Sequence, residues 1–307
     1  MRSSFEKSES LELGLAISEL NIETITELVP PAEPELDRPI CYRLKHVLFI
    51  DPYGMMMLIL FIQHLNAIGV PVEVELPESR DVLSWLERMD FFREVAGACR
   101  FDQDVGYLQH RTRNPAATLK EVTRIQNEHE IISIVTRLAQ ILTTRYPFKE
   151  GVVNRLSRIM LETFQNIPQH ANPFDEPIDP RGIAAIQDYQ GYLYLAIGDI
   201  GAGIATSLSL NPLYQGKQLS DLHALHAVVE EGVSRFGAQD PGRGGELKRI
   251  AALIGRYGGV MTVRSGEGLL AVSGGYTEVL LVDDFPGTQI GIRIPKRVLI
   301  HDHIDST

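Results

Sequence analysis

Asp199-Ile-Gly201-Ala-Gly203 lies at the end of an apolar strand candidate, Tyr192 to Ile197. A carboxylate at the end of a strand can accept a hydrogen bond from an exocyclic amine of a ligand, and glycines let the backbone come close to that ligand. The alternative is an ordinary strand-ending turn. Two further segments, one on either side in the sequence, decide between these interpretations.

The second segment, Gly242-Arg243-Gly244-Gly245, directly precedes a helix candidate that runs from about Gly245 to Tyr257. The first backbone N–H groups of a helix have no partner within the helix, so they can bind a phosphate. Many loops enter helices through glycine, so this pattern indicates a phosphate site only in combination with the other two segments.

The third segment is Glu162-x-x-x-Asn166 on a helix candidate that begins at about Glu150. Residues four apart lie on one face of a helix, here the face turned away from the apolar stripe. The asparagine oxygen can ligate Mg²⁺, and the glutamate can polarise a water or hydroxyl that attacks a γ-phosphate. The alternative is a solvated polar face. The order and spacing of all three segments make ATP binding the leading interpretation.

These segments resemble the N, G1 and G2 boxes of the GHKL superfamily, which includes gyrase and histidine-kinase ATPase domains, over roughly residues 120 to 297. Pro286-Gly287-Thr288 resembles the last strand of that family. The resemblance implies that Glu162 is the general base, that Asn166 ligates Mg²⁺, and that Asp199 contacts adenine together with Thr288. It places five glycine backbones around the ribose and phosphates: Gly201, Gly203, Gly242, Gly244 and Gly245. The implied fold is an α/β sandwich, a mixed sheet backed by helices.

Two positions depart from the family pattern. Glu246 stands where the family usually has glycine, and a carboxylate close to a triphosphate is electrostatically unfavourable. Pro168 follows Asn166 and removes a helix hydrogen bond, so we expect the helix to bend or end before His170. A packing role therefore suits His170 better than catalysis.

The first part of the chain predicts a small α/β domain. A strand at 47–50, a turn at Asp51 to Gly54 and a buried helix from Met55 to Ala67 resemble a STAS-like domain. Phosphorylatable relatives carry serine in that turn, where this chain has Pro52 and Tyr53. We place the STAS-like domain at 1–105, with 1–39 partly extended, a linker at 106–119, the GHKL domain at 120–300 and a tail at 301–307.

Composition limits the classes of partner. The net charge of −11 argues against a nucleic acid or an anionic membrane as the main partner. The most apolar stretch, Met55 to Ile62, is far shorter than the ~20 residues that cross a bilayer. The two cysteines, Cys41 and Cys99, form no metal-ligand pattern and suit a reducing cytoplasm.

Two functions compete. The first is a cytoplasmic ATP-binding regulator that contacts a protein partner and acts as a serine/threonine kinase or an ATP-dependent switch, with a homodimer left open. The second is a non-enzymatic interaction protein with a degenerate or structural ATP site. His129-Glu130 superficially resembles a phosphoacceptor pair, but no second helix candidate pairs with it into a dimerising hairpin.

The long connection from Ala205 to Pro241 joins two of the glycine segments. We expect it to be a lid that orders around bound nucleotide, with Lys217, Arg235 and Arg243 as candidate phosphate contacts. The alternative is a helical insertion packed rigidly on the domain.

Overall fold

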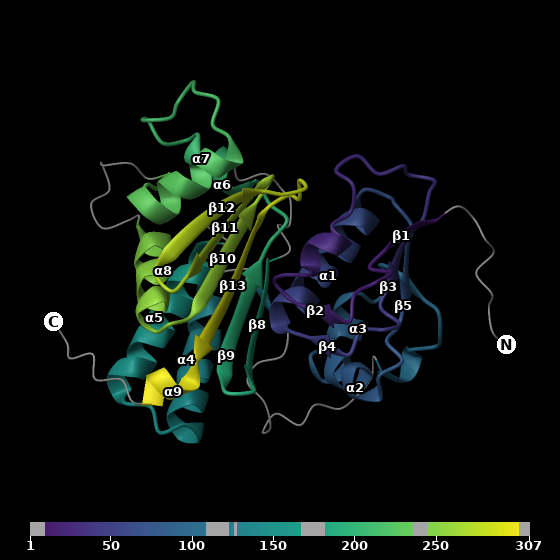
Figure 1. The fold of residues 1–307 in the computed structure, drawn as a ribbon, viewed down its shortest axis with the longest axis horizontal. Coiled ribbons are helices and arrows are strands. Elements are labelled where there is room, and N and C mark those ends of the chain that lie inside the picture. Colours follow the sequence, from purple (N-terminus) through teal and green to yellow (C-terminus); the bar gives the residue numbers. More distant parts are fainter. Residues whose placement is uncertain (1–9, 109–122, 126–127, 167–181, 236–244, 301–307) are drawn as a thin grey trace. The chain divides into compact units, whose positions relative to one another are not determined.

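The computed structural model of this 307-residue chain describes residues 10–108, 123–125, 128–166, 182–235 and 245–300. The chain divides into two compact units, Met1–Val122 (unit 1) and Thr123–Thr307 (unit 2) (Figure 1). Both units combine helices with sheets, so the predicted α/β class is confirmed. Within the described ranges, no helix is long and apolar enough to cross a membrane.

Unit 1 is built on a parallel sheet. Its four strands lie in the order β1 (Leu11–Leu13), β3 (Ile40–Arg43), β5 (Val72–Glu75) and β6 (Arg100–Phe101). A second parallel pair joins β2 (Glu19–Leu20) to β4 (Phe49–Ile50). The helices of unit 1 are η1 (Ile25–Leu28), α1 (Pro52–Ala67), α2 (Arg80–Arg88), α3 (Phe91–Glu94) and η2 (Gly106–Leu108).

Helix α1 is buried on almost every side, as its uniformly apolar sequence predicts. It begins at Pro52, three residues before the predicted start, because Asp51 caps it: the Gly54 N–H donates to Asp51 Oδ1 at 2.7 Å. The predicted turn at 51–54 is therefore the first turn of the helix, where proline and an aspartate cap are both favoured. Tyr53 is only 4% exposed, so its ring packs inside unit 1.

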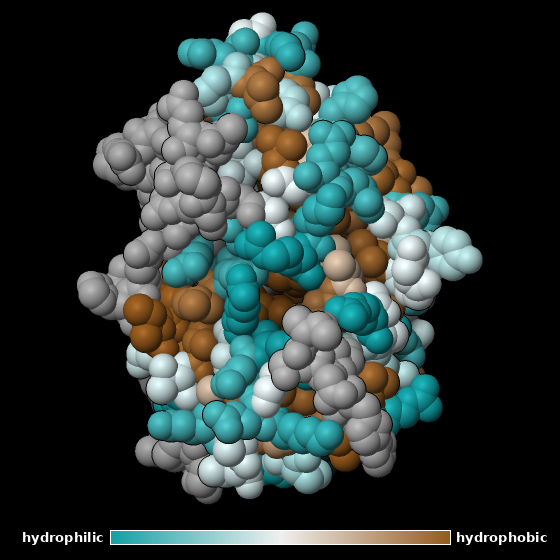
Figure 2. Space-filling model, turned by 90° about the vertical axis from the view of Figure 1, so that its left-hand side faces the viewer, coloured by the Kyte–Doolittle hydropathy of each residue, from teal (hydrophilic) through white to brown (hydrophobic). Residues whose placement is uncertain are grey.

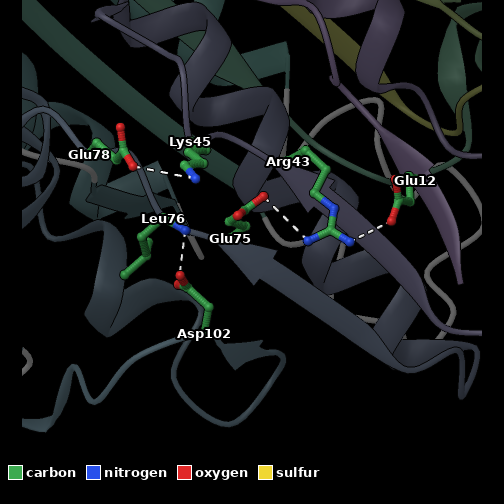
Figure 3. A network of polar contacts seen from close by, with 7 residues as sticks. All are labelled: Glu12, Arg43, Lys45, Glu75, Leu76, Glu78 and Asp102. Atoms are coloured by element: carbon green, nitrogen blue, oxygen red, sulfur yellow. Dashed lines mark hydrogen bonds and ion pairs between the residues drawn. The ribbon is translucent and has the colours of Figure 1, made fainter. Parts of the chain in front are cut away.

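A network of charged side chains connects the strands of unit 1 (Figure 3). Arg43 on β3 pairs with Glu12 on β1 and, at 3.3 Å, with Glu75 on β5. The Leu76 N–H donates to Asp102 Oδ1 at 3.0 Å, which ties the segment after β5 to the segment after β6. These bonds link neighbouring strands by polar contacts at their carboxyl ends.

Unit 2 contains a seven-stranded sheet in the order β12-β11-β10-β13-β9-β8-β7. The strands are β7 (Thr123–Ile125), β8 (Gly182–Tyr189), β9 (Tyr192–Gly198), β10 (Val260–Ser265), β11 (Gly268–Ser273), β12 (Tyr276–Leu281) and β13 (Thr288–Pro295). Every pairing among these strands is antiparallel, so the predicted mixed sheet is wrong for the described residues. Short hairpins join β8 to β9, β10 to β11 and β11 to β12, and a hairpin makes its two strands antiparallel.

Three helices of unit 2 lie together on one side of this sheet: α4 (Glu128–Arg145), α5 (Glu150–Asn166) and α8 (Glu246–Arg256) (Figure 1). The helix candidates from about Glu150 and from about Gly245 to Tyr257 correspond to α5 and α8. The connection from β9 to α8 contains α6 (Gly203–Leu208), α7 (Asp221–His226) and the π-helical segment η4 (Ala227–Glu231). The short helix α9 (Lys296–Ile300) follows β13.

Candidate functional site

A pocket that is partly open to solvent lies within unit 2. Its walls come from the ends of β9 and β13, from α5, from α6 and the segment around η4, and from the start of α8. Seen from the side of these helices, the molecule is hollowed near the centre of the view, with hydrophobic residues inside the hollow and hydrophilic residues around it (Figure 2). The lining residues are Thr163, Ile197, Gly198, Asp199, Ile204, Ser207, Leu208, Val228, Val233, Ser234, Arg235, Gly245, Glu246, Leu247, Thr288 and Ile290.

Four of the residues predicted from the sequence line this pocket: Asp199, Arg235, Gly245 and Thr288. They lie far apart in the chain. Asp199 and Thr288 meet because β9 and β13 pair antiparallel, which sets the end of β9 beside the start of β13. The Asp199 N–H donates to the Thr288 carbonyl at 3.0 Å and closes this end of the ladder.

The Asp199 carboxylate is held by backbone donors in a buried position. The side chain is 3% exposed, and its Oδ1 accepts from the Gly201 N–H at 2.8 Å and from the Thr288 N–H at 3.3 Å. Burial raises the pKa of Asp199 to about 7, although the two backbone donors act in the opposite direction. Both of these bonds fall on Oδ1, so the second oxygen keeps the capacity to accept from a ligand.

Ser265, at the end of β10, connects the two glycine turns beside Asp199. It is fully buried; its Oγ accepts from the Ile204 N–H at 2.8 Å and donates to the Gly287 carbonyl at 3.0 Å. A Cβ on Gly203, where φ is +75°, would lie 3.0 Å from Ser265 Oγ, and a Cβ on Gly287 would lie 2.1 Å from the Asp199 carbonyl oxygen. Close backbone approach therefore requires glycine at 287, and the positive φ together with the nearby Ser265 hydroxyl favours glycine at 203.

Two buried polar residues that hold the backbone around Asp199, Ser265 and Gln289, were not predicted from the sequence. Gln289 is fully buried, and its Nε2 donates at 2.8 Å to the carbonyls of Asp199 and Pro286. A polar residue inside or at the end of an apolar strand was the available signal, since a buried polar group needs hydrogen-bond partners. Which partners it finds depends on the strand pairing, which the sequence did not reveal.

Glu162 lies beside the pocket and does not line it. Its side chain is 15% exposed and accepts from Arg158 Nε, one turn earlier on α5, at 2.7 Å. Arg249 of α8 lies 3.9 Å from the same oxygen and 3.4 Å from Glu246 Oε1. The next residue, Thr163, is fully buried, lines the pocket and donates to the Ile159 carbonyl at 2.6 Å.

The start of α8 contributes the glycine-rich wall. Gly245 has a φ of +74° and precedes the first residue of the helix, Glu246, and both line the pocket. The preceding Gly242, Arg243 and Gly244 lie outside the described residues. So do Pro168 and His170, and the side chain of Asn166 at the end of α5.

The connection between β9 and α8 forms another wall. Leu208, Ala224 and Ala227 make a small buried cluster, against which Val228 and Val233 pack. Of the predicted cations here, Arg235 lines the pocket, whereas Lys217 lies over the Tyr214 ring, 5.9 Å from its centroid, and does not line it. No group of three or more metal-ligating side chains occurs among the residues described.

No protein-family model matches this sequence, and no curated protein matches it significantly.

Proposed function

We propose that unit 2 binds an adenine nucleotide together with Mg²⁺, and that the chain is a GHKL-type regulatory protein acting as a serine/threonine kinase or an ATP-dependent switch. The observation that carries this proposal is the setting of Asp199. This buried carboxylate has one oxygen that can still accept a hydrogen bond, and it lies in an apolar pocket beside Thr288 and a glycine turn. An apolar pocket with a few convergent polar groups and a perturbed pKa is typical of a ligand site.

The pocket residues suit a purine base. Ile197, Ile204 and Ile290 offer apolar surface, while Asp199 offers an acceptor to an exocyclic amine. The N-terminus of α8 lies at another wall, where the positive end of the helix dipole favours a phosphate. Asn166 is the proposed Mg²⁺ ligand, and bound Mg²⁺ would neutralise phosphate charge.

One pair of observations favours the alternative, a non-enzymatic interaction protein with a degenerate site. Glu162, the proposed general base, is engaged by Arg158, and Glu246 places a carboxylate in the pocket wall. We therefore separate binding from turnover in the tests.

Calorimetric titration tests binding directly. We expect Mg-dependent binding of ATP and little affinity for GTP, because guanine presents a carbonyl where adenine presents its amine. Asp199→Ala should abolish the preference. Asp221→Ala is the matched control, since Asp221 also accepts a backbone N–H, from Glu267 at 3.1 Å, but does not line the pocket. Equal affinity for ATP and GTP, or unchanged binding in Asp199→Ala, would contradict the proposal.

Single-turnover phosphate release from labelled ATP, with and without cell extract, separates kinase from switch. Glu162→Ala should keep nucleotide binding and lose turnover, whereas Asn166→Ala should chiefly lose the Mg²⁺ dependence of binding. A wild-type protein that binds ATP well but shows no turnover with any partner supports the switch.

For unit 1 we propose a docking role for a regulatory protein partner, without serine phosphorylation at the start of α1. Pro52 and Tyr53 occupy that start, and the Tyr53 side chain is buried. Phosphopeptide mapping after incubation with ATP checks this, and a phosphate on Tyr53 would contradict it.

A further inference from the structure

Arg249 lies where α5, α8 and the pocket rim meet. Its guanidinium is 3.4 Å from Glu246 Oε1 on its own helix and 3.9 Å from Glu162 Oε1 on α5. Its NH1 is 3.3 Å from the position that a Cβ on Gly245 would take. Since Gly245 and Glu246 both line the pocket, this cation stands at the pocket rim between two carboxylates.

Glu246 creates an electrostatic problem at this rim. As the first residue of α8 it interacts favourably with the positive end of the helix dipole. The same backbone N–H groups are the ones that would bind a phosphate, and a carboxylate next to a phosphate repels it. A pocket with this residue needs a compensating cation if it is to accept a polyphosphate.

Four charged side chains from the two helices form one cluster at this point. The pKa of Arg158 is raised above its usual value chiefly by its hydrogen bond to Glu162, and the charge of Glu246 adds to the effect. Arg249 contacts both glutamates. Two arginines thus face two glutamates in the described part of this site, and Arg249 offsets the charge of Glu246.

We propose that Arg249 is a positioning residue whose charge offsets Glu246 and allows this end of the pocket to accept the phosphates of a nucleotide. This inference rests on the proposed function, because it assigns Arg249 to the phosphate end of that site. It explains how a glutamate can stand where a glycine is expected. It predicts that the two residues depend on each other for phosphate binding and not for binding of the base.

Calorimetric titration with two probes tests this dependence, Mg-ATP and adenosine, which has no phosphate. Arg249→Gln should weaken Mg-ATP binding about tenfold, the effect of losing one charge-assisted interaction. Adenosine binding should stay within about twofold of the wild type. Adding Glu246→Gln to Arg249→Gln should restore most of the ATP affinity, because the carboxylate that repels the phosphates is then removed.

Three controls guard the interpretation. Arg256→Gln removes the same charge from an exposed position at the end of α8 and should leave ATP affinity unchanged. Arg249→Lys keeps the charge and should keep most of the affinity. Thermal unfolding by circular dichroism checks that each variant folds, as expected for Arg249, whose side chain is 48% exposed.

The outcomes are distinguishable. If the wild type binds neither ATP nor adenosine, the proposed function falls and this inference falls with it. If the wild type binds ATP but Arg249→Gln weakens ATP and adenosine equally, or Glu246→Gln gives no rescue, this inference is overturned while the proposed function stands.

Discussion

Asp199 combines burial with a charge that the proposed site needs. Its raised pKa of about 7 arises because burial penalises the charged form more than two backbone donors favour it. Only the ionised carboxylate has a second oxygen that is purely an acceptor. Ligand affinity should therefore depend on pH in the neutral range, where an ordinary aspartate does not titrate.

We expect adenosine affinity to fall as pH falls through 7. Below that pH the carboxylate takes up a proton, and apparent affinity scales with the ionised fraction, so each pH unit below the pKa should cost about tenfold. Adenosine is the suitable probe because it has no phosphate that titrates in this range. Titration calorimetry between about pH 5.5 and about pH 8.5 measures this dependence, and Asp199→Asn should give a flat profile. A flat wild-type profile would contradict the assignment of Asp199 as the acceptor.

Asp199 should also lower the stability of unit 2 as pH rises. Because its folded-state pKa is raised from 3.8 to about 7, the folded state holds a proton between these values that the unfolded state releases. Stability is therefore lost as pH rises through this window. Asp199→Asn should stabilise unit 2 at about pH 8 by up to roughly 4 kcal/mol, an upper limit from the size of the shift, with little effect at about pH 4. Denaturant unfolding at both pH values measures this, and a variant no more stable than wild type at the higher pH would contradict it.

At this scale the sequence predicted residues that have a local signature. Asp199 stands at the end of an apolar strand beside two glycines, and the structure places it in a pocket. Ser265 and Arg249 were missed, because each has partners on other elements: Ile204 and Gly287 for Ser265, and Glu162 for Arg249. Contacts of this kind follow from the tertiary arrangement and not from spacing along the chain.

Among the elements, α1, α5 and α8 were predicted because their patterns are local, and a local signal also marks the hairpin turn at Gln190-Gly191. Gln190 and Gly191 both have positive φ, which a two-residue hairpin turn favours. The start of α6 at Gly203 was missed, because a glycine with φ of +75° also fits a simple turn. Strand β11 was missed as well, and with it the hairpins that make the sheet antiparallel.

The connection from Ala205 to Pro241 is expected to order around bound nucleotide. In its described part, α6, α7 and η4 share a small buried cluster, and Leu208, Val228 and Val233 line the pocket. These walls would lose exposure when a ligand fills the pocket, so their amides should exchange more slowly. Hydrogen exchange with and without Mg-ATP measures this, with α4 as the segment expected to stay unchanged. Identical exchange across 205–241 in both states would mean a rigid insertion and would remove the lid.

On the scale of the whole molecule, each unit has its own buried core. Unit 1 packs its apolar residues around α1, and unit 2 packs α5 and α8 against its sheet. The proposed nucleotide site lies within unit 2 alone. A ligand that binds one unit stabilises that unit by mass action and leaves the other unchanged, unless the two units unfold together.

The single tryptophan, Trp85, lies in α2 of unit 1, so the unfolding of unit 1 can be followed separately from that of unit 2. Its fluorescence reports the unfolding of unit 1, whereas far-ultraviolet circular dichroism reports both units. Mg-ATP at about one hundred times its dissociation constant adds ~2.7 kcal/mol to the folded state of unit 2. We therefore expect a circular dichroism transition to rise by roughly 5 to 10 °C while the Trp85 midpoint stays fixed. Asp199→Ala should abolish the shift.

A rise of the Trp85 midpoint by the same amount would mean that the two units are energetically coupled. Nucleotide binding in unit 2 would then change the stability of unit 1, the unit that we propose as the docking surface.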